Sequence, residues 1–379
     1  MNQGEAMKRT ISRGKEIPGR RRAERGFTLT ELLVASSVML VMIIGTLSLY
    51  MRSNKVAVDQ SMYAELQHDV RSAMFFIARD VRMAGVGLPI QFGAYYFQGT
   101  DNEIQGAATV TPDRLLMMGN IEDPIILNIQ SYDGSANIIP INDFNFEQYP
   151  YPDTYYVNKT CLVVPNSASG CIVGQIKVIA NVTHGTGGTN EKVNCSSGLA
   201  TGVNAPGALP TTGCSPTDWA GGIITFIDVK EYWLDITGNY PGLTAGVNGY
   251  IGNGQGNILY MTYNGLHYPL AQSVENLQFE YNGDLDGNGQ LDGFRPWQNT
   301  WTQSQIGNIR EIRIAILGRT PRPFVSASTR VNPNVYIYQR PQVSNTAAAT
   351  QPDRCKRFLL ESSSNVRNLG LNLYNTGSR

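Results

Sequence analysis

The stretch "DLDGNGQLD" has residue types and spacing that suit a metal-binding loop. Its candidate ligands are Asp284, Asp286, Asn288, Gln290 and Asp292. They fall at positions 1, 3, 5, 7 and 9 of an EF-hand-type loop, where oxygen ligands wrap a hard cation. Gly289 supplies the bend at position 6, but Arg295 replaces the bidentate Glu of position 12. We predict that this loop binds Ca²⁺. The alternative is a hairpin tip whose Asp and Asn side chains are solvated turn residues.

A second chemical signal is the carboxylate of Glu31, which directly precedes an apolar run. Residues 32–51 contain no charge. An acidic group costs about 2–3 kcal/mol at the centre of a membrane and less near its surface, so it is a functional candidate. If the peptide bond before Phe27 were cut, the new α-amino group would lie one helical turn from Glu31. Glu31 could then face that amine on a neighbouring subunit.

Five cysteines are compatible with an oxidising compartment. Pairing neighbours along the chain gives Cys161–Cys171 and Cys195–Cys214 and leaves Cys355 alone, although sequence does not fix the connectivity. A zinc site is disfavoured because there is no C-x-x-C spacing and histidine is scarce. Free buried thiols are the remaining alternative.

Catalytic motifs are absent from the sequence. His68, His184 and His267 are the only histidines, and neither H-E-x-x-H nor G-x-S-x-G occurs. Residues 27–379 hold 22 basic and 27 acidic residues, a net charge of −5, without a basic stripe. We therefore predict neither an enzyme nor a nucleic-acid partner.

The element that must position Glu31 is a membrane helix. The 20 residues from Leu32 to Met51 would cover about 30 Å, the thickness of a bilayer core. The run is too long for the core of a cleaved secretory signal, and no small-x-small site follows it. Residues 1–26 hold eight Lys or Arg and three Glu, so the N-terminus should stay cytoplasmic.

The helix should continue beyond the membrane as an amphipathic segment that ends near Gly85. Its apolar positions recur at close to helical period: Val56, Met62, Leu66, Val70, Met74, Ile77, Val81 and Ala84. This pattern is typical of a face that docks on the protein's own sheet. We expect a single helix over residues 27–85, kinked or straight.

Short strands should follow in the remainder of the chain. The predicted strands are residues 113–119, 124–130, 161–165, 171–180, 222–229, 257–263, 277–282 and 309–317. Helices do not alternate with them, so a parallel doubly wound sheet is excluded. The prediction is an α+β fold in which the long helix packs on a β-rich domain, residues 86–379, with an insertion at about 130–255.

The stretch "RGFTLTELLVASSVMLVMIIGTL" resembles the class III signal of type IV pilins and type II secretion pseudopilins. The resemblance implies that a prepilin peptidase removes residues 1–26 by cutting after Gly26. Phe27 would then be N-methylated, and Glu31 would pair with the N-terminal amine of an adjacent pilin. It also implies the pilin fold. Translation could begin at Met1 or at Met7.

The stretches "DVRSAMFFIARDVRMAGVG", "PLAQSVENLQFEYNGDLDGNGQLDG" and "IREIRIAILGRT" resemble PilW-like minor pilins, as does the closing Arg367–Asn368. This implies a subunit that primes a type IV pilus or lies near its tip. Implied partners are other major and minor pilins, the inner-membrane assembly platform and a tip adhesin. The chain would pass from the bacterial inner membrane to the periplasm or an extracellular pilus. The alternatives are a J-type secretion pseudopilin and a subunit for cell adhesion or DNA uptake.

Overall fold

The computed structural model describes thirteen segments of the chain. They are residues 26–86, 97–105, 110–121, 125–132, 138–142, 149, 151–166, 175–184, 191–196, 215–252, 254–324, 338–349 and 352–366. The chain divides into two compact units, residues 1–54 and 55–379. The predicted leader up to Arg25 and the predicted Arg367–Asn368 tail lie outside the described residues.

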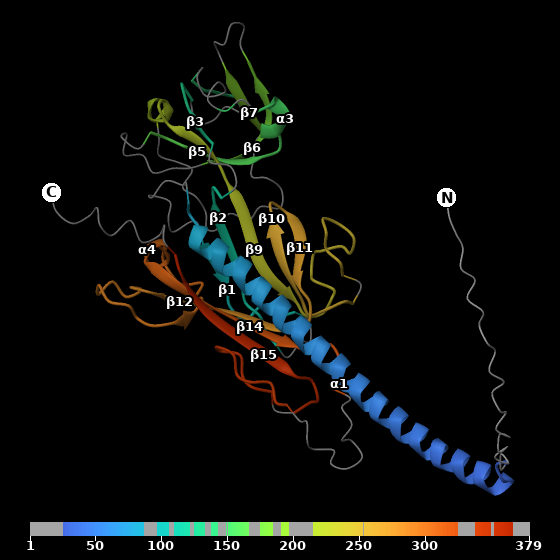
Figure 1. Ribbon diagram of the computed structural model, residues 1–379. Helices are drawn as coiled ribbons and strands as arrows, with labels where there is room; N and C mark the ends of the chain where they lie inside the picture. The colour runs from blue at the N-terminus through green and yellow to red at the C-terminus, as the bar shows by residue number, and fades with distance from the viewer. Residues whose placement is uncertain are drawn as a thin grey trace, which may run out of the picture. The chain divides into compact units, whose positions relative to one another are not determined.

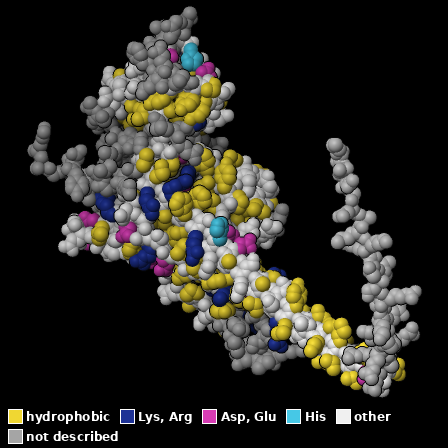
Figure 2. Space-filling model, in the orientation of Figure 1, with side chains coloured by type: hydrophobic (Ala, Val, Ile, Leu, Met, Phe, Trp, Pro, Cys, Tyr) yellow, Lys and Arg dark blue, Asp and Glu magenta, His cyan; other side chains and the backbone are white. Residues whose placement is uncertain are grey.

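The helix α1 (Leu29–Met83) belongs to both units. Its residues up to Asn54 lie in the first unit, and its residues from Lys55 begin the second. Within the first unit its apolar side chains are exposed, and Figure 2 shows hydrophobic side chains gathered along it. This segment is long and apolar enough to cross a membrane. The predicted N-terminal helix is confirmed, and its first half is able to span a membrane. Its observed bounds, Leu29–Met83, are close to the predicted residues 27–85.

The part of α1 in the second unit has one buried face. Six of the predicted apolar positions are buried: Leu66, Val70, Met74, Ile77, Val81 and Ala84. Val56 is 40% exposed, and the buried residues of the helix also include two charged ones, Asp59 and Asp80. The apolar period therefore identified the docking face, while its two buried carboxylates were not anticipated.

Asp80 fixes α1 to the strand β9 (Asp228–Asp235). Its side chain is fully buried and forms an ion pair with Lys230 at 3.1 Å, while the hydroxyl of Tyr232 donates a hydrogen bond at 2.6 Å. Arg79 adds a second ion pair at 2.9 Å. Burial, followed by the charge of Asp80, raises the pKa of Tyr232, so the phenol stays a donor.

Two antiparallel sheets lie beneath this helix (Figure 1). The first has the order β1-β2-β9-β10-β11, and its other strands are β1 (Phe97–Thr100), β2 (Arg114–Gly119), β10 (Ile258–Tyr263) and β11 (Leu266–Ala271). The second has the order β13-β12-β14-β15, formed by β12 (Val274–Gly283), β13 (Arg295–Pro296), β14 (Ile309–Arg319) and β15 (Arg357–Asn365). Their apolar faces share one core with α1.

Gly318 on β14 sets how closely the helix approaches the second sheet. A Cβ at this position would lie 2.7 Å from Leu66 Cδ1 and 2.8 Å from Val70 Cγ2. The hydroxyl of Ser364 on β15 also donates to the carbonyl of Ala78 at 3.1 Å. Absence of a side chain at Gly318 therefore lets α1 lie directly on the strands.

The insertion forms a third sheet that closes on itself. Its order is β3-β8-β5-β6-β7-β4, and its strands are β3 (Ile126–Asn128), β4 (Ile138–Pro140), β5 (Thr160–Val164), β6 (Gln175–Thr183), β7 (Lys192–Ser196) and β8 (Ile223–Phe226). An antiparallel bridge between Ile129 and Ile141 joins the two edge strands. A separate hydrophobic cluster that includes Leu127, Val163 and Ile224 fills its interior. The insertion is thus a small barrel, because closure pairs both edges.

Several predicted boundaries differ from the structure. The predicted strand 222–229 is two strands, β8 and β9, which belong to different sheets. The barrel strands cover residues 126–226, whereas the expected insertion ran to about 255. Three short helical turns complete the described fold: α3 (Asp153–Tyr156), η3 (Pro216–Trp219) and α4 (Gln303–Gly307).

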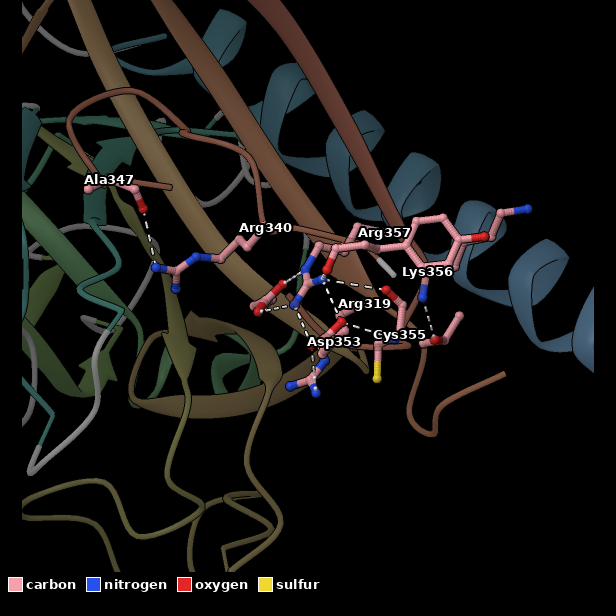
Figure 3. A network of polar contacts seen from close by, with 10 residues as sticks. Arg319, Arg340, Ala347, Asp353, Cys355, Lys356 and Arg357 are labelled. Carbon is pink, nitrogen blue, oxygen red and sulfur yellow. Dashed lines mark hydrogen bonds and ion pairs between the residues drawn. The ribbon is translucent and has the colours of Figure 1, made fainter. Parts of the chain in front are cut away.

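Arg357 ties the segment before β15 to the second sheet. Its guanidinium forms ion pairs with Glu275 on β12 at 2.5 Å and with Asp353 at 2.8 Å. Figure 3 shows Arg357 pointing toward Asp353, which Arg319 also approaches, at 3.2 Å. Burial lowers the pKa of Arg357, but the contacts with Glu275 and Asp353 outweigh it and raise the pKa.

Candidate functional site

The N-terminus of α1 holds Glu31 in a capping box. Thr28 is the residue before the helix, and its backbone N–H and hydroxyl each donate to Glu31 Oε2 at 2.9 Å. The Glu31 backbone N–H donates back to the Thr28 hydroxyl at 3.3 Å. This reciprocal arrangement satisfies helix-terminal donors and is the usual role of a T-x-x-E sequence. Glu31 therefore has a local partner, and its carboxylate is still exposed.

The fold itself places no demand on the two residues of the predicted processing site. A Cβ added to Gly26 would meet no heavy atom within 4 Å. Phe27 is 87% exposed.

The predicted metal loop connects β12 to β13. Asp284, Asp286 and Asp292 each present an oxygen within 4.8 Å of the others. The backbone N–H groups of Leu285 and Asp286 donate to Asp292 Oδ2 at 2.7 and 3.1 Å. The loop thus gathers three carboxylates and orients them with its own backbone. Its flanking elements are the strands β12 and β13, of which the sequence predicts only the first, as residues 277–282.

The outer part of the loop is also ordered by its own side chains. The Asn288 backbone N–H donates to Asp286 at 3.0 Å, and the Gln290 backbone N–H donates to the Asn288 amide oxygen at 2.8 Å. Gly289 has a φ of +84° and donates its N–H to Asp284 Oδ2 at 3.0 Å. The bend expected at position 6 is therefore present, at a residue that tolerates this conformation.

Two further observations describe the ability of the loop to take a cation. Asp284 Oδ1 is buried and has no hydrogen-bond partner among the described residues. Arg295, at position 12, lies 3.6 Å from Asp292 Oδ1. A buried oxygen without a donor favours a cation in the loop. Arg295 disfavours a cation, because its positive charge lies beside Asp292, one of the candidate ligands.

The three described cysteines are buried, and no disulfide bond joins any two of them. Cys161 on β5 and Cys195 on β7 both line the interior of the barrel, and Cys355 is buried separately. The hydrogen bond with Cys195 and the burial of its sulfur raise the pKa of Cys161. Cys171 and Cys214 lie outside the described residues. The pairings Cys161–Cys171 and Cys195–Cys214 stay predictions.

Comparison with known families matches two separate segments of the chain. Residues 21–47 match the model described as the prokaryotic N-terminal methylation motif. Residues 252–368 match the model described as type IV pilus-assembly protein W. In these two segments the chain is similar to type IV pilin-related families. The first segment contains Gly26, Phe27 and Glu31, and the second contains the whole loop from Asp284 to Asp292.

A solved structure to which this chain is similar is a type IV-like pilin from Thermus thermophilus. The two are 12% identical, the match covers 38% of this chain and 80% of that one, and the TM-score is 0.18. The comparison with curated proteins returned no match. The strands of the barrel, residues 126–226, lie outside both family-matched segments.

Sequence reasoning missed the capping role of Glu31 although the signal was present. The letters "TLTE" place Thr28 three residues before Glu31 at the start of an apolar helix, which is the sequence signature of a capping box. The burial of Asp59 and Asp80 on the docking face had no comparable signal, because their partners come from distant segments.

Proposed function

We propose that this chain is a minor pilin, a structural subunit that primes type IV pilus assembly or lies near the filament tip. The observation that carries the proposal is the combination of the methylation motif at residues 21–47 with the match to pilus-assembly protein W at residues 252–368. A transmembrane-capable helix connects the motif to a β-rich body. This organisation suits a subunit that is anchored in the inner membrane before it enters a filament.

In this proposal the first residues of α1 carry the assembly chemistry. A prepilin peptidase cuts after Gly26, and the new N-terminus of Phe27 is methylated. The amine keeps a positive charge in an apolar surrounding, where an ion pair is stronger than in water. Glu31 of a neighbouring subunit supplies the negative partner. The bonds from Thr28 leave Glu31 Oε1 without a protein hydrogen bond among the described residues, so the carboxylate can accept another donor.

The partners in this proposal are the proteins that the subunit would meet between the inner membrane and the pilus. They are the prepilin peptidase, other major and minor pilins, the inner-membrane assembly platform and a tip adhesin. Before assembly the chain spans the inner membrane once with a cytoplasmic N-terminus. After assembly the body lies in the periplasm or on the extracellular pilus.

We also propose that Ca²⁺ stiffens the β12–β13 hairpin. The ligands would be carboxylates of Asp284, Asp286 and Asp292, with Asn288 and the Gln290 carbonyl completing an oxygen set. The buried oxygen of Asp284 without a donor supports this proposal. A bound cation would offset the repulsion among three carboxylates whose oxygens lie within 4.8 Å of one another.

Filament fractionation tests the pilin proposal. A strain that carries an epitope-tagged chain is sheared, and pili and membranes are probed separately. The tagged chain should occur in both fractions, and its deletion should reduce surface pili. If deletion leaves piliation intact and instead stops the export of folded enzymes, the chain is a J-type secretion pseudopilin.

The barrel supports a second candidate function in adhesion or DNA uptake. Its strands lie outside both family-matched segments, so it can carry a property that other pilins lack. Removal of residues 126–226, with the ends joined by a short flexible linker, should leave filament incorporation intact if the barrel is a binding module. Loss of cell attachment or of DNA uptake by such filaments would then identify its role.

A further inference from the structure

A pocket of about 340 Å³ lies in the second unit between the start of its α1 segment and the C-terminal region. The helix contributes one side of this pocket, including Val56, Asp59 and Tyr63, and the other side includes Phe324 and Lys356. Neither the predicted processing site nor the Asp loop touches it. Its walls combine aromatic rings with one carboxylate and one ammonium group.

Asp59 is the unusual member of the pocket. The residue is only 6% exposed, and its Oδ2 atom has no hydrogen-bond partner among the described residues. It also forms no ion pair within 4 Å in that part of the chain. A buried carboxylate oxygen without a hydrogen-bond partner is costly, because it has lost water and gained no donor. Asp59 therefore needs an external donor, and a cation with N–H groups suits it best.

Lys356 provides the opposite charge in the same pocket. Its Nζ atom lies 4.4 Å from the centre of the Tyr63 ring and 5.6 Å from that of Phe324. It forms no ion pair within the described segments. Two backbone bonds with Thr320 hold it: Lys356 N donates to the Thr320 hydroxyl at 3.1 Å, and Thr320 N donates to the Lys356 carbonyl at 2.9 Å.

A second basic group lies close to this pocket. The exposed Arg322 approaches α1 one turn beyond Asp59, with its Nε 3.0 Å from the sulfur of Met62. Lys356 therefore lines the pocket together with Asp59, and Arg322 reaches the next turn of α1 from outside the pocket. The matching ligand is a zwitterion, with an N–H cation for Asp59 and an anion for the basic groups.

Only a short stretch of chain joins the apolar run to this pocket. Three residues lie between Arg52, which ends the apolar run, and Val56 at the pocket wall. Even fully extended, that tether spans at most about 14 Å. The polar headgroup layer is about 5–8 Å thick on each side of a bilayer core. Lipid headgroups are therefore the zwitterions in reach whenever the N-terminal helix spans a bilayer.

We propose that this pocket binds the phosphoethanolamine headgroup of a membrane lipid. The primary ammonium donates hydrogen bonds to Asp59, and the phosphate lies against Lys356 and Arg322. Phosphatidylcholine fits poorly because its quaternary ammonium has no N–H to donate. Phosphatidylglycerol fits poorly because it has no cation. The proposal needs only insertion of the helix, so it holds for a pilus subunit and for a secretion pseudopilin alike.

Native mass spectrometry of the full-length chain released from lipid nanodiscs tests the proposal. Nanodiscs contain phosphatidylethanolamine, phosphatidylcholine or phosphatidylglycerol with the same acyl chains. Phosphatidylethanolamine should remain bound at least about ten times more tightly than either competitor, as expected for charge-assisted hydrogen bonds in a partly dry site. Asp59→Asn should remove this preference. Asp69→Asn is the matched control, because it removes a carboxylate from the same helix outside the pocket.

Lys356→Met separates headgroup binding from internal pairing. If a lipid bridges the two charges, Lys356→Met should weaken retention of phosphatidylethanolamine and leave the folded state intact by circular dichroism. If Lys356 itself satisfies Asp59, the three lipids will be retained equally and both variants will lower the melting temperature. Equal retention of the three lipids by the wild type, or an unchanged preference in Asp59→Asn, overturns the proposal.

Discussion

Thr28 and Glu31 are joined by reciprocal hydrogen bonds at the first turn of α1, with the Glu31 carboxylate accepting from both the N–H and the hydroxyl of Thr28 at 2.9 Å. Glu31 therefore has two candidate roles, a local cap and a charge for a neighbouring amine. The cap needs only an oxygen acceptor, whereas the pairing needs a negative charge. This difference makes the two roles separable by mutation.

The first prediction concerns the charge of Glu31. Glu31→Gln keeps an acceptor for Thr28 but removes the charge, so the chain should be processed and inserted yet enter filaments poorly. Thr28→Ala keeps the charge and loses the cap hydroxyl, at a cost of about 0.5–2 kcal/mol in helix stability. It should enter filaments nearly normally. Immunoblots of sheared pili and membranes measure both, and equal defects would assign Glu31 to the cap alone.

The second prediction concerns Gly26. A Cβ at this position meets nothing within 4 Å in the structure, so Gly26→Val should not disturb folding or insertion. It should still block maturation, because the peptidase must approach the backbone closely. Gly45→Val is the control, since that glycine in α1 has equal free space and lies beyond the cleavage site. The mass of the membrane-extracted chain reports the result, and removal of the leader from Gly26→Val would contradict it.

The third prediction concerns the joint between α1 and the first sheet. Asp80→Ala leaves Lys230 buried without its carboxylate, which should lower the free energy of unfolding by about 3–5 kcal/mol. Asp80→Ala combined with Lys230→Met should recover much of that loss, because no buried charge is left alone. Urea unfolding of the three proteins measures both values. A double variant as unstable as Asp80→Ala would show that the ion pair is not the source of the effect.

The fourth prediction concerns calcium. If Ca²⁺ binds only the folded chain, the melting temperature should rise with its concentration, and ten times the dissociation constant should add about 1.4 kcal/mol. Extracellular sites often bind at about 10⁻⁴ to 10⁻³ M, so the titration must reach several millimolar. Asp284→Ala with Asp286→Ala should abolish the rise, and Asp69→Asn should not. No stabilisation of the wild type would favour a solvated turn with Arg295 in place of the missing ligand.

The fifth prediction concerns His184 on the barrel. A hydrogen bond with Asp153 at 2.8 Å raises the pKa of His184, and Glu191 adds to the effect. A raised histidine pKa gives stability that is complete below the unfolded pKa, about 6.5, and is lost as pH rises through the folded pKa. Water screens this half-exposed pair, so the stability change should be small. NMR titration should place the pKa above 6.5, and Asp153→Asn should lower it.

The sequence was most informative where the signal was long and local. The period of Leu66, Val70, Met74 and Ile77 extends over several turns, so both the helix and its docking face could be predicted. The clustering of the Asp284, Asp286 and Asp292 carboxylates was equally readable, because these residues lie within nine positions of the sequence. Short strands such as β4 and β13 were missed, since two or three residues carry no distinctive alternation.

Contacts between distant segments were beyond prediction. The bridge between Ile129 and Ile141 closes the barrel, and it depends on the arrangement of all six strands. Neither residue carries a local sequence signal for this pairing. Asp80 forms an ion pair with Lys230, which lies 150 residues later in the sequence. The buried Asp59 likewise depends on a pocket whose other wall comes from Phe324 and Lys356. Such partners are set by tertiary packing and leave no local period.

The identity of the N-terminus in assembled filaments tests the central claim most directly. Pili are sheared from cells, the tagged chain is isolated, and its N-terminal peptide is sequenced by mass spectrometry. The account predicts a chain that begins at Phe27 and carries a methyl group on its α-amino nitrogen. A filament-borne chain that keeps residues 1–26, or begins elsewhere, would contradict the assignment as a processed pilin.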